Sequence, residues 1–199
     1  MSLRKKRIAL IRGAAVPVVF LAVFVRPSWS LDSTVGFALE LAGYFFLLAG
    51  LGIRMWSTLY IGGRKSHELV TDGPYSICRN PLYVGTMLLA IGAGLCFENP
   101  LMLAAVVLLI APVHLMASGM EERHLLELFP DAYPKYAQAV PRFWPKLGHY
   151  RAAGSVTVGV RSIRRATIDA MAVLLLPEVE DLLEVLHHHR IVPVLFHFP

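Results

Sequence analysis

The segment from Ser66 to Gly85 holds the residues best suited to bind a polar ligand. Gly73-Pro74 is typical of a turn, and Asn80-Pro81 predicts the start of a helix with proline in its first turn. A helix start presents free backbone N–H groups and a partial positive charge, which suit an anionic group such as a carboxylate. Tyr75 and Tyr83 add flat aromatic faces and hydroxyls. The alternative is a plain interfacial turn with tyrosine anchors.

The second segment is an acidic pair, Glu121-Glu122, which follows a long apolar run. We expect this pair at the end of a helix, where the helix dipole is unfavourable for acids. An acid in so poor a position indicates a function, and its carboxylate can accept hydrogen bonds from ribose hydroxyls or from an ammonium group. The alternative is that both acids are solvated and pair with Arg123 or Arg79.

The composition indicates what kind of protein positions these segments. Of the 199 residues, 56% are hydrophobic and 17% are charged, whereas soluble proteins average about 25% charged residues. Intrinsic disorder is excluded, because disordered chains are poor in apolar residues, and two cysteines are too few for a disulfide scaffold. We expect an all-α integral membrane protein whose partner is the lipid bilayer, and the net charge of +5 does not require nucleic acid.

Four apolar stretches have, or nearly have, the length of about 20 residues that a helix needs to cross a bilayer. They cover residues 8–25, 35–53, 81–97 and 101–120. A cleaved signal peptide is the alternative for the first, but its apolar core is long and no clear cleavage site follows it. The short link from Phe97 to Pro100 makes the third and fourth helices a hairpin, and Pro112 should kink the fourth.

The basic residues predict the orientation. Of the 19, only Arg26 lies in a turn assigned to the outside. Lys and Arg collect on cytoplasmic loops, so both termini and the loop 54–80 are expected in the cytoplasm. Residues 131–145 resemble a short interfacial helix, and a change in composition then divides a transmembrane domain, 1–145, from a cytoplasmic or membrane-surface extension, 146–199. Basic residues beside apolar ones in this extension favour anionic lipid.

These motifs, in this order, resemble the isoprenylcysteine carboxyl methyltransferase family, which has many bacterial members, over residues 40–145. The matching positions are His67-Glu68-Leu69-Val70, Gly73-Pro74-Tyr75, Arg79-Asn80-Pro81-Leu82-Tyr83-Val84-Gly85, Glu121-Glu122, Phe129, Tyr133, Tyr136 and Val140-Pro141. The resemblance implies an S-adenosylmethionine site between the central loop and the start of the C-terminal region, in a bacterial inner-membrane protein. It assigns to the cofactor His67, Glu68, Leu69, Val70, Tyr75, Asn80, Pro81, Leu82, Tyr83 and Glu121.

Two positions depart from the family pattern. Asn80 replaces a histidine, and an amide does not titrate near neutral pH, so this position cannot act as a base. Ala117 replaces an arginine that helps to hold the substrate carboxylate in the eukaryotic enzymes. Either another cation, such as Arg79, Arg123 or Arg142, takes over, or the natural acceptor is not a prenylcysteine, which is the reading we favour.

The resemblance implies methyl transfer to a lipophilic or lipidated acceptor at the cytoplasmic membrane face, with a carboxylate favoured over an amine. A carboxylate is already ionised and needs no base. An amine would need one, for which the candidates are Glu121, Glu122, His67 and His124. No catalytic residue is assigned. The alternatives are an NADPH-dependent membrane reductase of the steroid 5-alpha-reductase type and a non-catalytic membrane scaffold.

Histidines at two other places in the sequence are candidates for a function. No metal site is expected at His187-His188-His189, because three consecutive residues cannot share one helical face. His114 is a polar residue inside an apolar stretch, which indicates either a function or, as we favour, an interhelical hydrogen bond.

Overall fold

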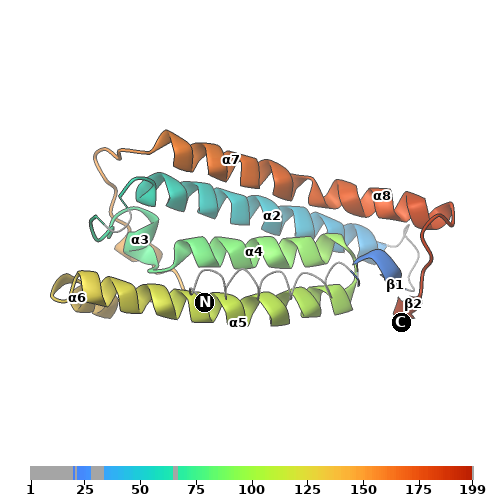
Figure 1. Ribbon diagram of the computed structural model, residues 1–199, viewed down its shortest axis with the longest axis horizontal. Helices are drawn as coiled ribbons and strands as arrows, with labels where there is room; N and C mark the ends of the chain where they lie inside the picture. The colour runs from blue at the N-terminus through green and yellow to red at the C-terminus, as the bar shows by residue number, and fades with distance from the viewer. Residues whose placement is uncertain (1–19, 21, 28–33, 65–66, 199) are drawn as a thin grey trace, which may run out of the picture. The chain divides into compact units, whose positions relative to one another are not determined.

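The computed structural model describes residue 20 and residues 22–27, 34–64 and 67–198. Two compact units can be distinguished, one of residues 1–48, 87–113 and 172–199, and the other of residues 49–86 and 114–171. The described elements (Figure 1) are β1 (Val25–Pro27), α2 (Thr34–Ile61), α3 (Pro74–Ile77), α4 (Pro81–Cys96), α5 (Pro100–Leu128), α6 (Ala132–Ala139), the 3-10 turn η1 (Leu147–His149), α7 (Val160–Leu174), α8 (Leu176–His188) and β2 (Phe196–Phe198).

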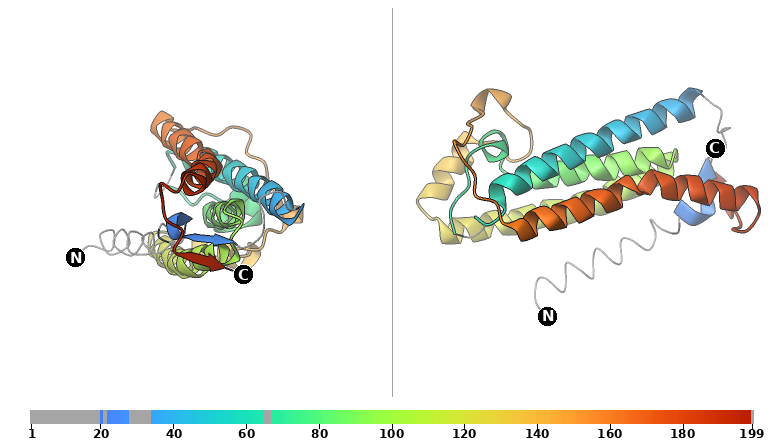
Figure 2. Two further views of the ribbon diagram at one scale, coloured as in Figure 1. Left: turned by 90° about the vertical axis from the view of Figure 1, so that its right-hand side faces the viewer. Right: turned by 90° about the horizontal axis from the view of Figure 1, so that it is seen from above.

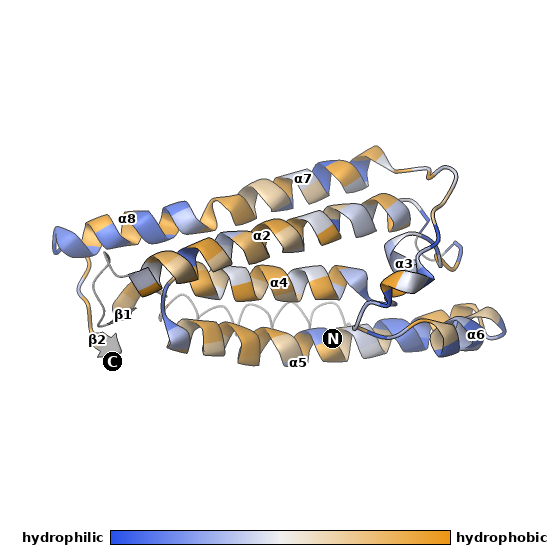
Figure 3. Ribbon diagram, turned by 180° about the vertical axis from the view of Figure 1, so that it is seen from behind, coloured by the Kyte–Doolittle hydropathy of each residue, from blue (hydrophilic) through white to orange (hydrophobic). Residues whose placement is uncertain are grey.

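Two of the described helices, α2 with 28 residues and α5 with 29, are long and apolar enough to cross a membrane. Only 22% of the most apolar part of each is buried, whereas the core helix of a soluble protein is mostly buried. Hydrophobic residues dominate α2 and the first part of α5 in Figure 3. The all-α prediction is therefore confirmed for the main elements, with two candidate spans.

Of the other two predicted spans, one is shorter than a spanning helix and one is not tested. α4 has 16 residues, slightly fewer than the roughly 17–25 of a spanning helix. The predicted span over residues 8–25 lies almost wholly outside the described residues.

Both long helices extend beyond their predicted ends. α2 continues to Ile61 rather than stopping at residue 53, so Arg54 lies inside it. α5 continues to Leu128, so the prediction that Glu121 and Glu122 lie at a helix end is wrong. The residues after the pair include several leucines and a glutamate, which are good helix formers. The apolar run ends at the first charges, but the helix does not.

In the first unit, α2 and α4 approach each other at two glycines. A Cβ atom added to Gly43 would lie 3.0 Å from the carbonyl oxygen of Gly92, and one added to Gly92 would lie 2.8 Å from that of Gly43. Small residues allow this close approach of helices. At the α4–α5 link, Asn99 Oδ1 accepts the backbone N–H of Leu101 at 2.9 Å and caps α5. Pro100 is the first residue of α5, where the missing backbone N–H of proline costs no helical hydrogen bond.

The C-terminal segment of this unit pairs with residues that precede α2. β1 and β2 are parallel, with Val25 opposite Phe196, and Figure 2 shows them side by side. The backbone N–H of Leu195 also donates to the carbonyl of Phe24 at 3.0 Å. The predicted topology placed the turn at Arg26 outside and the C terminus in the cytoplasm. Because strand pairing brings these segments together, the two assignments cannot both hold.

In the second unit, the chain after α6 holds the segment from Gly73 to Asn80. The backbone N–H groups of Gly73 and Arg79 donate to the carbonyls of Arg151 and Pro141 at 2.7 and 2.9 Å. Gly73 has φ 57°, and a Cβ atom there would lie 2.2 Å from the ring of Tyr60, so the turn requires glycine. The predicted turn at Gly73-Pro74 and the predicted helix start at Pro81 are both confirmed.

Candidate functional site

Two of the predicted cofactor residues meet between α4 and α5. Tyr83, in the first turn of α4, donates a hydrogen bond from its hydroxyl to Oε2 of Glu121 at 3.2 Å. The ring of His114, two helical turns before Glu121 in α5, lies edge-on to the Tyr83 ring at a centroid distance of 5.5 Å. A carboxylate, a phenol and an imidazole are thereby gathered in one place, and His114 contacts an aromatic residue of the site.

Asn80 belongs to a second network, centred on Glu122. Asn80 Nδ2 donates to Glu122 Oε1 at 2.7 Å, and Arg142 Nε donates to the same oxygen at 3.2 Å. Arg142 Nη2 also donates to the hydroxyl of Ser118 at 3.3 Å. The partner of Glu122 is therefore Arg142 rather than Arg123 or Arg79. Through this network Asn80 fastens the central loop to α5.

Tyr75 is buried close to the Tyr83–Glu121 pair. Its side chain is 6% exposed, and its hydroxyl is buried with no hydrogen-bond partner among the described residues. Burial first, and the Glu121 carboxylate second, raise the pKa of Tyr75 well above its ordinary value. The phenol therefore stays protonated and can donate. Its backbone is fixed, since the hydroxyl of Tyr136 donates to the carbonyl of Tyr75 at 2.8 Å.

The predicted quartet from His67 to Val70 divides into two parts. Val70 is buried, and Leu69 packs against the cluster of Tyr133, Tyr136 and Val140. His67 and Glu68 are exposed, and Glu68 forms an ion pair with Arg64. The apolar pair thus belongs to the core beneath the loop, whereas the polar pair lies in an exposed turn.

The start of α4 offers fewer free donors than the sequence indicated. Pro81 has no backbone N–H, and the N–H groups of Tyr83 and Val84 donate to the carbonyl of Asn80 at 3.0 and 3.1 Å. Pro81 is buried and Leu82 is half-buried. Side chains, rather than the helix start, supply most of the polar groups of the site.

Ser118 and Arg142 were not assigned to the site from the sequence, although Arg142 was one of three cations considered. A Cβ atom added to Gly119 would lie 3.3 Å from Arg142 Nη2. The guanidinium thus lies against the turn of α5 that follows Ala117. The run of small residues Ala117-Ser118-Gly119, which leaves room for a large side chain, was the available signal.

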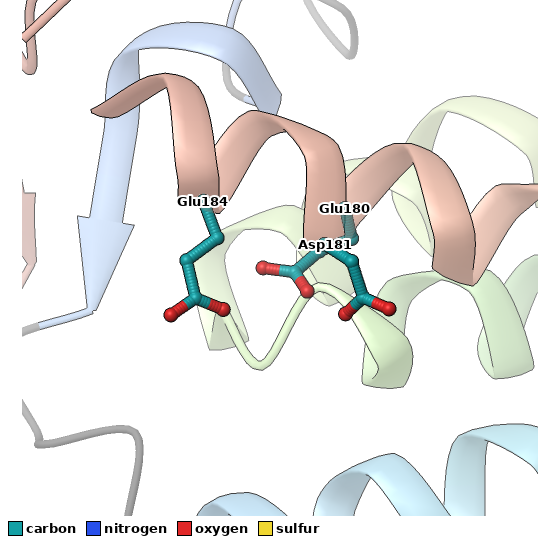
Figure 4. Close-up of side chains that lie close together, drawn as sticks. All are labelled: Glu180, Asp181 and Glu184. Atoms are coloured by element: carbon teal, nitrogen blue, oxygen red, sulfur yellow. The ribbon is translucent and has the colours of Figure 1, made fainter. Parts of the chain in front are cut away.

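Acidic and histidine residues of α8 lie in the first unit. The carboxylates of Glu180, Asp181 and Glu184 are within 4.8 Å of one another and project from one stretch of the helix (Figure 4). Asp181 is exposed and the other two are half-buried, as on a solvated helix face. His187 is buried, with Nε2 2.8 Å from the carbonyl oxygen of Val23, while His188 and His189 are exposed.

Comparison with known proteins gives two full-length relatives. The chain is 34% identical to the cobalt-zinc-cadmium resistance protein CzcN of Cupriavidus metallidurans over 185 residues, which are 93% of this chain and 85% of the relative. It is 34% identical to the nickel-cobalt-cadmium resistance protein NccN of Alcaligenes xylosoxydans xylosoxydans over 198 residues, 99% of this chain and 92% of the relative. The second match includes the C-terminal region that the sequence motifs did not cover.

Methyltransferases match a shorter part of the chain. Protein-S-isoprenylcysteine O-methyltransferase B of Arabidopsis thaliana is 33% identical over 77 residues, 39% of each chain. This confirms the resemblance inferred from the sequence motifs. No solved structure gives a significant match. The phospholipid methyltransferase family matches residues 32–132. This range covers half of the chain and includes the Tyr83–Glu121 and Asn80–Glu122 contacts. The chain therefore belongs to the phospholipid methyltransferase family.

Proposed function

We propose that this protein is an S-adenosylmethionine-dependent methyltransferase that acts on a lipophilic acceptor, preferably a carboxylate, at the cytoplasmic face of the membrane. The observation that carries the proposal is the Tyr83–Glu121 hydrogen bond, close to the buried Tyr75 hydroxyl, which lacks a partner in the described part of the chain. Family membership supports methyl transfer over the reduction considered as an alternative.

The side chains present fit the polar groups of the cofactor. The Glu121 carboxylate can accept hydrogen bonds from ribose hydroxyls or from an ammonium group. The Tyr75 hydroxyl, protonated and without a partner among the described residues, can donate to a cofactor oxygen or nitrogen. The rings of Tyr83 and His114 offer aromatic surface to a heterocycle or a cation. We include the His67–Val70 segment in the proposed site, with Leu69 and Val70 as its apolar wall.

The protein's own contribution is to hold the reactants and to exclude water. When bound, S-adenosylmethionine supplies a methyl group already activated on a sulfonium. Correct placement of two reactants can contribute about 7–11 kcal/mol. A carboxylate acceptor needs no base, and Asn80, bound to Glu122, provides none. We propose that the acceptor enters from the bilayer and the cofactor from the cytoplasm.

Titration of the detergent-solubilised protein by calorimetry, separately with S-adenosylmethionine and with NADPH, tests this function. S-adenosylmethionine should bind, and Tyr83→Phe should weaken its binding about tenfold, which corresponds to about 1.4 kcal/mol, because the variant loses the hydroxyl that holds the Glu121 carboxylate in place. Tyr44→Phe, in the other unit, is the matched control and should bind as the wild type does. Binding of NADPH alone would support a reductase, and binding of neither ligand would support a scaffold.

The names of the two full-length relatives suggest a physiological setting. Both are called resistance proteins for cobalt and cadmium, with zinc or nickel, and we propose that methyl transfer here supports growth in such metals. In a strain that lacks the gene, the wild type should restore growth in added Co²⁺ or Cd²⁺, and Glu121→Gln should not. Equal restoration by both would show that resistance does not depend on the site, and growth without added metal is the control.

A further inference from the structure

Two buried donor groups lie next to the candidate site. They are the O–H of Tyr133, in α6, and Nε–H of Arg79, the residue before Asn80, and neither hydrogen has an acceptor among the described residues. Tyr133 is only 5% exposed. A buried donor without an acceptor costs about 1–3 kcal/mol, so a native protein rarely keeps one without a reason.

Both donors are held in place by their surroundings. The backbone N–H of Arg79 donates to the carbonyl of Pro141 at 2.9 Å, and that of Tyr133 donates to the carbonyl of Phe129 at 2.9 Å. The ring of Tyr133 packs against the ring of Tyr136 at a centroid distance of 6.1 Å. The same cluster includes Leu125. The two donors are therefore preorganised rather than loosely placed.

Positive charge and donors are in excess around Tyr133. Burial, and after it the Glu122 carboxylate, raise the pKa of Tyr133, while the charge of Arg79, a hydrogen bond between the Arg79 side chain and the Tyr133 hydroxyl, and the charge of Arg142 lower it. Two guanidinium groups thus face one carboxylate, and Oε1 of that carboxylate already accepts hydrogen bonds from Asn80 and Arg142. What the surroundings lack is an additional acceptor that carries negative charge.

We propose that Arg79 and Tyr133 form an oxyanion subsite that receives the carboxylate or phosphate head group of the methyl acceptor. This assignment rests on the methyltransferase function proposed above. A guanidinium presents N–H groups in a planar fork that matches two oxygens of a carboxylate or phosphate, and the phenol adds another donor. Leu125 and Phe129, which pack against the cluster of Tyr133, Tyr136 and Val140, provide apolar contacts suited to an acceptor with a hydrocarbon part.

Thermal unfolding of the full-length protein in detergent tests this subsite. The unfolding temperature, Tm, is compared in chloride, acetate, decanoate and inorganic phosphate at equal ionic strength. Decanoate or phosphate should raise the Tm of the wild type. Tyr133→Phe should lower the Tm in chloride less than Tyr136→Phe does, because the O–H that it removes has no acceptor among the described residues, and it should lose the rise caused by the anion. Arg79→Lys, which keeps the charge but not the fork, should reduce that rise.

Tyr136→Phe is the matched control, because its hydroxyl has a partner, the carbonyl of Tyr75 at 2.8 Å. Its Tm should fall in chloride, while the rise caused by the anion remains. The proposal is overturned if Tyr133→Phe lowers the Tm as Tyr136→Phe does, or if both Tyr133→Phe and Arg79→Lys keep the full anion response. A larger response to decanoate than to phosphate assigns the subsite to a carboxylate, and the reverse assigns it to a phosphate.

S-adenosylmethionine, added to the same samples, separates this proposal from the proposed function. If the wild type responds to the anion but not to S-adenosylmethionine, the methyltransferase proposal fails and the anion site remains. If saturating S-adenosylmethionine removes the anion response, the donors bind the carboxylate of the cofactor, and their assignment to the acceptor is wrong. Additive responses support the assignment.

Discussion

Glu121→Gln should lower the affinity for S-adenosylmethionine at least tenfold and leave the Tm nearly unchanged. The amide keeps an oxygen that can accept from the Tyr83 hydroxyl, whose bond to Glu121 measures 3.2 Å. It loses the negative charge that would bind an ammonium group or ribose hydroxyls, and hydrogen bonds to charged groups contribute about 1.5–3 kcal/mol. Calorimetric titration together with thermal unfolding measures both quantities.

A neighbouring acid provides the control for this variant. Glu127→Gln removes one negative charge from the same helix at an exposed position, and it should bind S-adenosylmethionine with the affinity of the wild type. Equal losses in the two variants would show that Glu121 acts only through the overall charge of α5. Unchanged affinity in Glu121→Gln would exclude this carboxylate from the cofactor site.

Glu122→Ala should instead destabilise the protein. Its side chain is 19% exposed, and its partner Arg142 is 37% exposed, so the pair is partly screened by solvent. Loss of the carboxylate leaves the Asn80 amide and the Arg142 guanidinium without their shared acceptor. We expect a loss of about 1–3 kcal/mol, and for a chain of this size each 1 kcal/mol lowers the Tm by about 2–4 °C.

Glu122→Gln separates the hydrogen bonds of Glu122 from its charge. The glutamine oxygen can still accept hydrogen bonds from Asn80 and Arg142. The Tm of Glu122→Gln should therefore lie between those of the wild type and Glu122→Ala. A Tm of Glu122→Ala equal to that of the wild type would show that the network contributes nothing to folding. In that case the contacts of Glu121 and Glu122 would not indicate which acid binds the cofactor and which stabilises the fold.

The local parts of the site could be predicted because glycine and proline specify local geometry. Gly73-Pro74 and Asn80-Pro81 identified the turn and the start of α4 at the correct residues. The end of α5 could not be found in the same way, because apolar content marks the lipid-facing part of a helix and not the helix itself. The acids that were expected at the end of a helix lie inside it, because α5 continues to Leu128.

The tertiary contacts could not be predicted from the sequence for a different reason. Several arginines could have partnered Glu122, and only the folded chain brings to it Arg142, which is 20 positions further along the sequence. The three-residue strands β1 and β2 are too short to show an alternating pattern. Family motifs indicated Tyr83 and Glu121 separately, but the hydrogen bond between them depends on how α4 and α5 pack.

The pairing of β1 with β2 also bears on how the protein is made. Val25 and its partner Phe196 are separated by nearly the whole chain, so β1 is synthesised long before its partner leaves the ribosome. Domains begin to fold during synthesis from the N-terminal side, and the residues of α2, α4 and α5 are all complete before β2 exists. Closure by β2 thus follows the synthesis of all three helices, and a chain terminated before Phe196 would leave the edge of β1 unpaired.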